Sequence, residues 1–243
     1  MKFLATSDIH APNYIPLLRE SLEKALRDVL EGVCIVFLAG DYVDEGKHQF
    51  MPLVTRVLEP LRNKPVLAVF GNDDYEEVRD KIRSAASWFR WLDDEEETIE
   101  VGGLTVRVFG TMGVLDQPTR WQEKNVPGIR RIYDGRLQRI EEFARERKGD
   151  EIRILLTHYS PTYKTLVGEP RFAWPQMGSR RVEKVLEKYG TIDLVVHGHA
   201  HKSRVLETRI GKTRVLNVAL PARKSIVIDS VSAGPRSLLD FIR

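Results

Sequence analysis

The sequence has almost no cysteine and no long uncharged apolar run. Its one cysteine, Cys34, excludes a disulfide within the chain. No apolar run reaches the roughly 20 residues that a membrane-spanning helix needs. The amino terminus, MKFLATSDIH, starts with an apolar segment of strand length, which is too short for a secretory signal peptide. From these absences we expect a cytoplasmic protein without a membrane partner.

The sequence also lacks a strong excess of charge of either sign. Its formal net charge is +3, although 30% of its residues are charged. The chain as a whole therefore gives little indication of nucleic-acid binding, although local basic clusters remain. With 42% hydrophobic residues in a chain of 243, a sizeable core can be buried, and no repeat or low-complexity linker is present. We predict a single domain over residues 1–243 and make no prediction of oligomeric state.

Short apolar strands alternate with amphipathic helices along the sequence. KFLATSD, VCIVFLAGD and PVLAVFGND predict strands, with helical patterns at residues 17–30, 50–61 and 75–91. TIEVGGLTVRVFG predicts a hairpin, and EIRILLTH and IDLVVHGH predict strands on either side of a helix that ends at Gly190. Three further strands are expected after residue 202. This order predicts an α/β (α+β) fold, a sandwich of mixed sheets covered by helices.

Acids, an amide and histidines follow the predicted strands. They are Asp8, His10, Asp41, Asp44, Asn72, Asp73, Asp74, His158, His199 and His201. Ligands of open α/β sheets lie at the carboxyl ends of strands, so these side chains could converge. Each also has a structural explanation when taken alone. Asp8 could cap a helix, Asp41 could be a turn residue, and His158 could be a hydrogen-bonded core histidine.

The electrostatics of the whole set argue against purely structural roles. Several carboxylates at one edge would repel each other and lose hydration unless a cation neutralised them. Mixed carboxylate and imidazole ligands suit Mn, Fe, Zn, Co or Ni better than Ca, which prefers oxygen alone. The sequence therefore predicts a divalent-metal site at the carboxyl ends of the strands.

Five short blocks resemble those of a known family. They are DIH at residues 8–10, GDYVD at 40–44, GND at 71–73, TH at 157–158 and GHAH at 198–201. In this order, each after a predicted strand, they resemble the blocks of the calcineurin-like metallophosphoesterases, and in particular of the small prokaryotic phosphodiesterase-type members. The resemblance implies a four-layer α-β-β-α sandwich with two mixed sheets and a metal site at the carboxyl ends of the strands.

The resemblance also implies two divalent metal ions, with Mn²⁺ favoured and Fe, Zn, Ni or Co as alternatives. The first would be held by Asp8, His10 and His201, the second by Asn72, His158 and His199, with Asp41 bridging the two. Ions in such sites lie roughly 3.5–4 Å apart, and a hydroxide that they share attacks phosphorus in line. The implied function is hydrolysis of a phosphodiester, with a small phosphoester or a nucleotide as substrate.

Two acids of these blocks are predicted to support catalysis. Asp44 fits a role in orienting a histidine ligand. Asp73 stands where most of the family has a histidine that protonates the leaving oxygen. An ionised Asp73 would repel phosphate, so it could act as an acid only with a raised pKa. Its neighbour Asp74 is expected to orient the loop.

Two segments, residues 113–134 and 160–178, are predicted to form lids. The first interleaves Arg120 and Trp121 with further basic residues, which could stack a base and contact phosphate. A solvated loop with one packed tryptophan is the alternative. The second carries Tyr163 shortly after His158, and loops that follow a metal ligand are natural substrate walls. We predict Arg120, Trp121 and Tyr163 as substrate-binding residues.

Other functions of related proteins are weighed against the phosphodiesterase. GDYVDEG is similar to the GDYVDRG of protein Ser/Thr phosphatases, but Glu45 replaces the arginine that grips phosphate, which disfavours a phosphoprotein substrate. A phosphomonoesterase is a further alternative. A nuclease, and with it a nucleic-acid partner, is less favoured because only about forty residues follow His201. A non-catalytic scaffold is disfavoured because all the expected ligands are present. We expect His197, the first histidine of HGHAH, to support the site or the core without binding metal.

Overall fold

The computed structural model describes residues 1–28 and 30–233. Its strands are β1 (Lys2–Thr6), β2 (Val33–Leu38), β3 (Val66–Ala68), β4 (Arg90–Trp91), β5 (Glu95–Val101), β6 (Leu104–Thr111), β7 (Ile152–Thr157), β8 (Leu194–His197), β9 (Glu207–Ile210), β10 (Thr213–Asn217) and β11 (Val227–Ser230). Its α-helices are α1 (Ile15–Asp28), α2 (Met51–Leu58), α3 (Arg79–Ala85), α4 (Arg120–Asn125), α5 (Ile129–Arg145), α6 (Arg180–Tyr189) and α7 (Leu220–Arg223). The predicted single domain includes residues 234–243, which lie outside the described residues.

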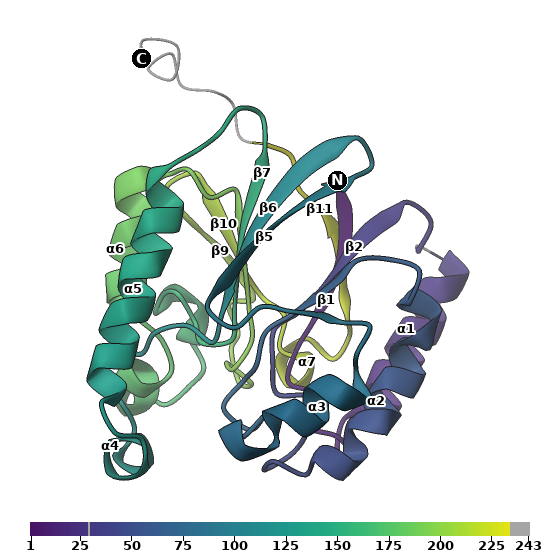
Figure 1. Ribbon diagram of the computed structural model, residues 1–243, viewed down its shortest axis with the longest axis horizontal. Helices are drawn as coiled ribbons and strands as arrows, with labels where there is room; N and C mark the ends of the chain where they lie inside the picture. The colour runs from purple at the N-terminus through teal and green to yellow at the C-terminus, as the bar shows by residue number, and fades with distance from the viewer. Residues whose placement is uncertain (29, 234–243) are drawn as a thin grey trace.

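Two mixed sheets form the centre of the molecule. One has the strand order β11-β1-β2-β3-β4 and the other β5-β6-β7-β8-β10-β9. Most neighbours pair in parallel, whereas β11, β5 and β9 are antiparallel edge strands. Helices α1, α2 and α3 cover one side and α5 and α6 the other (Figure 1). The predicted sandwich of two mixed sheets with flanking helices is confirmed.

Three hydrophobic cores separate the four layers. The central core lies between the sheets and includes Phe37 of β2 and Val108 of β6. The next residue of β2, Leu38, belongs instead to the core beneath α1 and α2. Likewise Leu155 of β7 packs under α5 and α6, whereas its neighbours face the central core. Strands buried on both faces need apolar side chains at every position, which explains the continuous apolar runs of the sequence.

The helix predicted at residues 75–91 is shorter than expected. It ends with Ala85, and residues 90–91 form β4, which pairs in parallel with β3. The ring of Trp91 stacks on Phe70 with 4.5 Å between ring centroids. The open edge of the first sheet thus outweighs the local helical pattern, because pairing there satisfies the backbone and buries an aromatic side chain.

The first predicted lid segment also contains more helix than expected. Its helix α4 is introduced by a capping box, in which Thr119 Oγ1 accepts from the Gln122 amide (3.2 Å) and Gln122 Oε1 accepts from the Thr119 amide (2.9 Å). Helix α5 then begins at Ile129, within the predicted lid segment of residues 113–134. Among the described residues, no helix is long and apolar enough to cross a membrane.

A pair of glycine substitutions is expected to change stability in opposite directions. A Cβ on Gly110 of β6 would lie 2.2 Å from the Cβ of Leu92, the residue that follows β4, so Gly110→Ala should push this segment away from β6 and cost about 1–3 kcal/mol. Gly135 lies inside α5 with open space around it, so Gly135→Ala should stabilise by about 0.5–1 kcal/mol. Urea unfolding of both variants tests this. Equal effects would contradict the close approach of the sheets.

Candidate metal centre

Loops from both sheets meet at the carboxyl ends of β1, β2, β3, β7 and β8. Within the first sheet, the amide of Asp8 donates to the Gly40 carbonyl (2.9 Å). Between the sheets, the amide of His199 donates to both carboxylate oxygens of Asp8 (3.1 and 3.0 Å). These contacts bring three of the five sequence blocks, DIH, GDYVD and GHAH, to one place.

Four of the predicted ligands form a first cluster: Asp8, His10, Asp41 and His201 each offer one ligand atom within 4.8 Å of the others. His201 Nε2 lies 2.8 Å from Asp8 Oδ1 and 3.4 Å from His10 Nε2. His10 Nε2 in turn lies 3.6 Å from Asp41 Oδ2. Carboxylate oxygens and imidazole nitrogens therefore converge on a small volume.

A second cluster shares Asp41 with the first and adds His158 and His199. His158 Nε2 lies 3.4 Å from Asp41 Oδ2 and 3.0 Å from the amide oxygen of Asn72. The same oxygen of Asp41 thus faces a histidine of each cluster. The structure brings together all seven side chains that the sequence predicted as ligands.

The ring of His158 has a defined tautomer. Its Nδ1 lies 2.8 Å from the carbonyl oxygen of Ala39, at the end of β2. A carbonyl can only accept, so Nδ1 carries the proton and Nε2 presents a lone pair to the cluster. A histidine held in this way by a backbone carbonyl is a common arrangement at metal sites.

The backbone at the site adopts a conformation that is unusual for its residues. Among the described residues, seven that are not glycine have positive φ, and four of these belong to the clusters: Asp8 (56°), His10 (39°), Asp41 (55°) and His199 (67°). Such conformations cost about 1–3 kcal/mol each and persist where the surrounding structure imposes them, often at functional sites. The concentration of strain in the clusters therefore supports a functional site.

Two glycines of the sequence blocks make room for carboxylates. A Cβ on Gly71 would lie 2.1 Å from Asp41 Oδ1, and one on Gly198 would lie 2.4 Å from Asp8 Oδ2. No side chain fits at either position. The glycines of the GND and GHAH blocks are thus required because the loops approach the acids so closely.

Asp74, which was expected to orient the loop, is fully buried and holds two loops together. Its Oδ2 accepts from the amides of Asp41 (2.8 Å) and Gly71 (2.9 Å). Its Oδ1 accepts from the amides of Tyr42 (3.0 Å) and, at 3.4 Å, Val43. This carboxylate fixes the turn that carries Asp41 without itself belonging to either cluster.

The charge balance of the clusters fits a cation. In the described part of the chain, no lysine or arginine forms an ion pair with Asp8, Asp41 or Asp73. Burial, together with the charges of the neighbouring acids, raises the pKa of Asp41 well above its ordinary value. Burial lowers the pKa of His199 well below its ordinary value, which keeps the imidazole neutral, as metal binding requires. The donor set therefore fits divalent transition-metal ions.

A sequence model of the calcineurin-like phosphoesterase family matches residues 1–203. The chain belongs to this family. Members are hydrolases that act on phosphoesters with divalent metals, and the matched range includes every residue of the two clusters. The resemblance seen in the five sequence blocks is thereby confirmed.

Solved structures share the fold of this phosphoesterase at low sequence identity. A phosphopantetheinyl hydrolase from Mycobacterium tuberculosis superposes with a TM-score of 0.60 at 16% identity, over 92% of this chain and 90% of that chain. The protein TT1561 of Thermus thermophilus superposes with a TM-score of 0.59 at 16% identity, over 94% of this chain and 98% of that chain. A 5′-nucleotidase precursor from Thermus thermophilus superposes with a TM-score of 0.54 at 13% identity, over 96% of this chain and 54% of that chain. No curated protein is significantly similar in sequence.

The two acids predicted to support catalysis have different surroundings in this phosphoesterase. Asp44 Oδ2 accepts from Lys47 Nζ (2.6 Å), whereas Asp73 Oδ2 lies 3.2 Å from Nδ1 of the predicted ligand His10. Burial alone raises the pKa of Asp73, but the contact with His10 outweighs it, and the net pKa lies below its ordinary value. This direction does not favour Asp73 as a proton donor, and the parts of Asp44 and Asp73 in catalysis stay predictions.

The predicted substrate residues lie on two segments that are joined to each other. The amide of Gln117 donates to the Pro175 carbonyl (2.8 Å), and the amide of Asp116 to the Gly178 carbonyl (3.1 Å). The hydroxyl of Tyr163 is occupied by Asp116 Oδ2 (2.8 Å), which favours a structural role. Arg120 and Trp121 are exposed on α4, with 62% of Trp121 accessible. Their role in binding substrate stays a prediction.

Tyr159 and Gln122 connect α4 to the clusters, and the sequence reasoning missed both. The ring of Tyr159 contacts His199, with 5.0 Å between centroids, and also His158 (5.4 Å). Gln122 Nε2 donates to the Tyr159 hydroxyl (3.1 Å). An aromatic residue directly after the TH block was the available signal. The helix that carries Trp121 is thus anchored to a residue that touches two predicted ligands.

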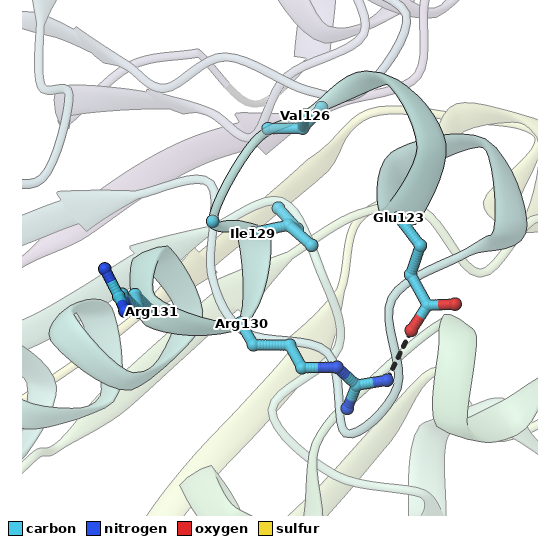
Figure 2. Close-up of a pocket in the computed structure, with 6 residues that line it drawn as sticks. Glu123, Val126, Ile129, Arg130 and Arg131 are labelled. Atoms are coloured by element: carbon cyan, nitrogen blue, oxygen red, sulfur yellow. Dashed lines mark hydrogen bonds and ion pairs between the residues drawn. The ribbon is translucent and has the colours of Figure 1, made fainter.

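An open pocket lies apart from the clusters, at the junction of α4 and α5 (Figure 2). It is lined by Glu123, Val126, Gly128, Ile129, Arg130 and Arg131. Figure 2 shows Arg130 paired with Glu123 across it, while Arg131 points away from that pair. None of the predicted ligands lines this pocket, so it is not the reaction site.

His197 and His199 are expected to differ in their effect on metal content. His197 is fully buried, its Nδ1 faces the Gly198 carbonyl (2.9 Å) and its Nε2 faces Thr165 Oγ1 (2.9 Å), so both nitrogens are occupied. Burial lowers the pKa of His197 to about 4, so the ring is neutral at pH 7. After loading with Mn²⁺ and desalting, folded His197→Ala should retain the wild-type metal content, whereas His199→Ala should lose about one ion per chain. Equal losses would contradict the assignment.

Proposed function

We propose that this chain is a phosphodiesterase that holds two divalent cations, with Mn²⁺ as the first candidate. The observation that carries the proposal is the position of Asp41. One of its oxygens lies 3.6 Å from His10 Nε2 and 3.4 Å from His158 Nε2. A carboxylate between two sets of ligands is suited to bridging a pair of metal ions.

The side chains divide into two sets around that carboxylate. Asp8, His10 and His201 would hold one cation, and Asn72, His158 and His199 the other. When bound, such cations supply a hydroxide for in-line attack near neutral pH and positive charge opposite the nonbridging phosphate oxygens. Asn72 contributes a neutral oxygen, so it adds no negative charge that would weaken the attraction of the pair for phosphate.

The charge of Asp73 supports a diester as substrate. Burial raises the pKa of Asp73, but the contact with His10 outweighs it and leaves the pKa below its ordinary value, so Asp73 is ionised at neutral pH beside the first cluster. A diester carries one negative charge whereas a monoester carries nearly two, so repulsion by this carboxylate is weaker for the diester. An ionised Asp73 also cannot protonate the leaving oxygen, so esters with good leaving groups should react fastest.

We infer that Arg120 and Trp121 contact the part of the substrate that lies beyond the phosphate. Helix α4 is tied through Gln122 and Tyr159 to the ring of His199, which places the exposed Trp121 on an element next to the clusters. An exposed aromatic ring beside an arginine can stack on a planar group and pair with an anion. Small phosphoesters, including nucleotides, have this chemistry.

Hydrolysis of bis-p-nitrophenyl phosphate in the presence of Mn²⁺ tests the proposed function. Wild-type protein should turn over this diester faster than p-nitrophenyl phosphate, and chelation should abolish activity. Asp41→Ala should reduce kcat/KM by at least about 100-fold, since it removes a ligand of both cations. Asp80→Ala is the control, because that acid is 97% exposed on α3.

Three results would contradict this proposal in different ways. Absence of any metal-dependent turnover would favour a scaffold protein. Preference for the monoester would favour a phosphomonoesterase. Full activity of Asp41→Ala would contradict the proposal that Asp41 serves two cations.

A further inference from the structure

We propose that Asp73 is a positioning residue that orients one predicted ligand of each cation. The sequence comparison with the family suggested a substitute for a missing proton donor at this position. The geometry instead places its carboxylate between the side chains of His10 and Asn72. This inference rests on the proposed function, because it concerns the same two cations.

The first contact is with His10. Asp73 Oδ2 lies 3.2 Å from His10 Nδ1, an ion-pair distance, and this buried nitrogen has no hydrogen-bond partner in the described part of the chain. The ring is largely buried, with 9% of the side chain exposed. A carboxylate beside Nδ1 favours a proton on that nitrogen, which leaves the Nε2 lone pair facing Asp8 and Asp41.

The second contact is with Asn72. The amide nitrogen of Asn72 donates to Asp73 Oδ1 (2.9 Å). Because the nitrogen is held there, the amide oxygen points the other way, to within 3.0 Å of His158 Nε2. Rotation of the amide by half a turn would present N–H groups in place of a ligand oxygen. Asp73 thereby selects the oxygen of Asn72 for the second cluster.

The backbone of Asp73 completes the arrangement independently of its side chain. Its amide donates to Asp41 Oδ1 (2.7 Å), which leaves Oδ2 of Asp41 to face His10 and His158. Its carbonyl accepts from the amide of Gly46 (2.8 Å), which fixes the loop. Substitution of the side chain should therefore leave Asp41 in place and change only the orientation of His10 and Asn72.

The other acid nearby does not take this role. One ligand atom of Asp44 lies within 4.8 Å of atoms of His10 and Asp73, but among the described residues Asp44 forms its ion pair with Lys47 and none with a histidine. The second carboxylate oxygen of Asp73 has an additional weak contact from the Glu45 amide at 3.5 Å. Both oxygens of Asp73 thus contact groups of the protein.

Binding of Mn²⁺ alone, followed by the electron paramagnetic resonance signal of the free ion, tests the proposal without any substrate. Wild-type protein should bind two ions. Asp73→Ala should weaken both, each by about 10- to 100-fold, as is typical when the partner of a metal ligand is removed. In Asp73→Asn one of the two carboxylate oxygens becomes an NH₂ group, so the side chain can keep an oxygen facing either His10 or Asn72 but not both. The Mn²⁺ affinity of one site should therefore fall and that of the other should be retained.

A charge-matched control separates orientation from simple loss of negative charge. Glu45→Gln removes one negative charge from the adjacent turn, where Glu45 contacts Lys47 and no predicted ligand. Its Mn²⁺ affinities should stay within about twofold of wild type, because exposed charges act weakly through solvent. Thermal unfolding of each metal-free variant verifies that the fold is retained, and the near-isosteric Asp73→Asn serves if Asp73→Ala does not fold.

A spectroscopic readout examines the ring of His10 directly. In long-range proton–nitrogen spectra of metal-free wild-type protein, His10 should carry its proton on Nδ1. In Asp73→Ala the two neutral tautomers should both be populated. An unchanged tautomer would overturn the role at His10.

The failure of this inference and of the proposed function can be told apart. If wild-type protein does not bind two Mn²⁺ ions, the proposed function is wrong. If wild-type protein binds two ions and Asp73→Ala binds them equally well, only the role of Asp73 is wrong. Equal weakening by Glu45→Gln and Asp73→Asn would reduce Asp73 to a source of charge and would also overturn the inference.

Discussion

The main constraint on this molecule is negative charge gathered at the ends of two sheets. The carboxylates of Asp8, Asp41 and Asp74 are buried and that of Asp73 is partly buried, and in the described part of the chain none of the four has an arginine or lysine as ion-pair partner. Asp74 is satisfied by backbone amides from two loops, Asp8 by the amide of His199, and Asp41 by the amide of Asp73. To point these amides at the acids, the chain enters left-handed conformations and places glycine where a Cβ would collide. The loops at this end of the strands are thus built around negative charge.

The sequence predicted the layers and the convergence of the site for simple reasons. Continuous apolar runs in the strands reflect burial on both faces, and the polar blocks follow the strands because parallel strands end at a common edge. Those two facts bring Asp8 and Asp41 to one edge of the first sheet, whereas the approach of His158 depends on how the second sheet packs against it. The orientation of these side chains could not be predicted from the sequence, because it depends on contacts between residues far apart in the chain, such as that of His158 with the carbonyl of Ala39.

Where the sequence reasoning was incomplete, a competing physical effect can be named. The helix expected up to residue 91 gave way to β4, since the sheet edge offered pairing that local periodicity does not reveal. The segment around α4 was predicted only as a lid, yet T-R-W-Q at residues 119–122 carries the capping-box pattern that starts the helix. The contact of Asp73 with His10 joins two residues whose proximity follows only from the closeness of β1 and β3 in the sheet order.

The two candidate lids are less independent than their separation in sequence suggests. Asp116, just before α4, accepts hydrogen bonds from Tyr163 and from the Ser179 hydroxyl at the start of α6. One acid therefore holds together the loop after β6, the loop after β7 and the first turn of a helix. A wall fixed in this way keeps its shape when substrate arrives, so selectivity should come mainly from the exposed side chains on its rim.

The contact between His158 and the carbonyl of Ala39 crosses from one sheet to the other. Because the two proposed sets of ligands come from loops of both sheets, any cation held there would also connect the two sheets and stabilise their packing. A ligand that binds only the folded chain adds RT ln(1 + [L]/Kd) to the free energy of unfolding, which is about 2.7 kcal/mol at a hundredfold excess over Kd. The persistence of the fold would then vary with the supply of metal, so that scarcity of the ion would expose the protein to unfolding and to proteases as well as to loss of turnover.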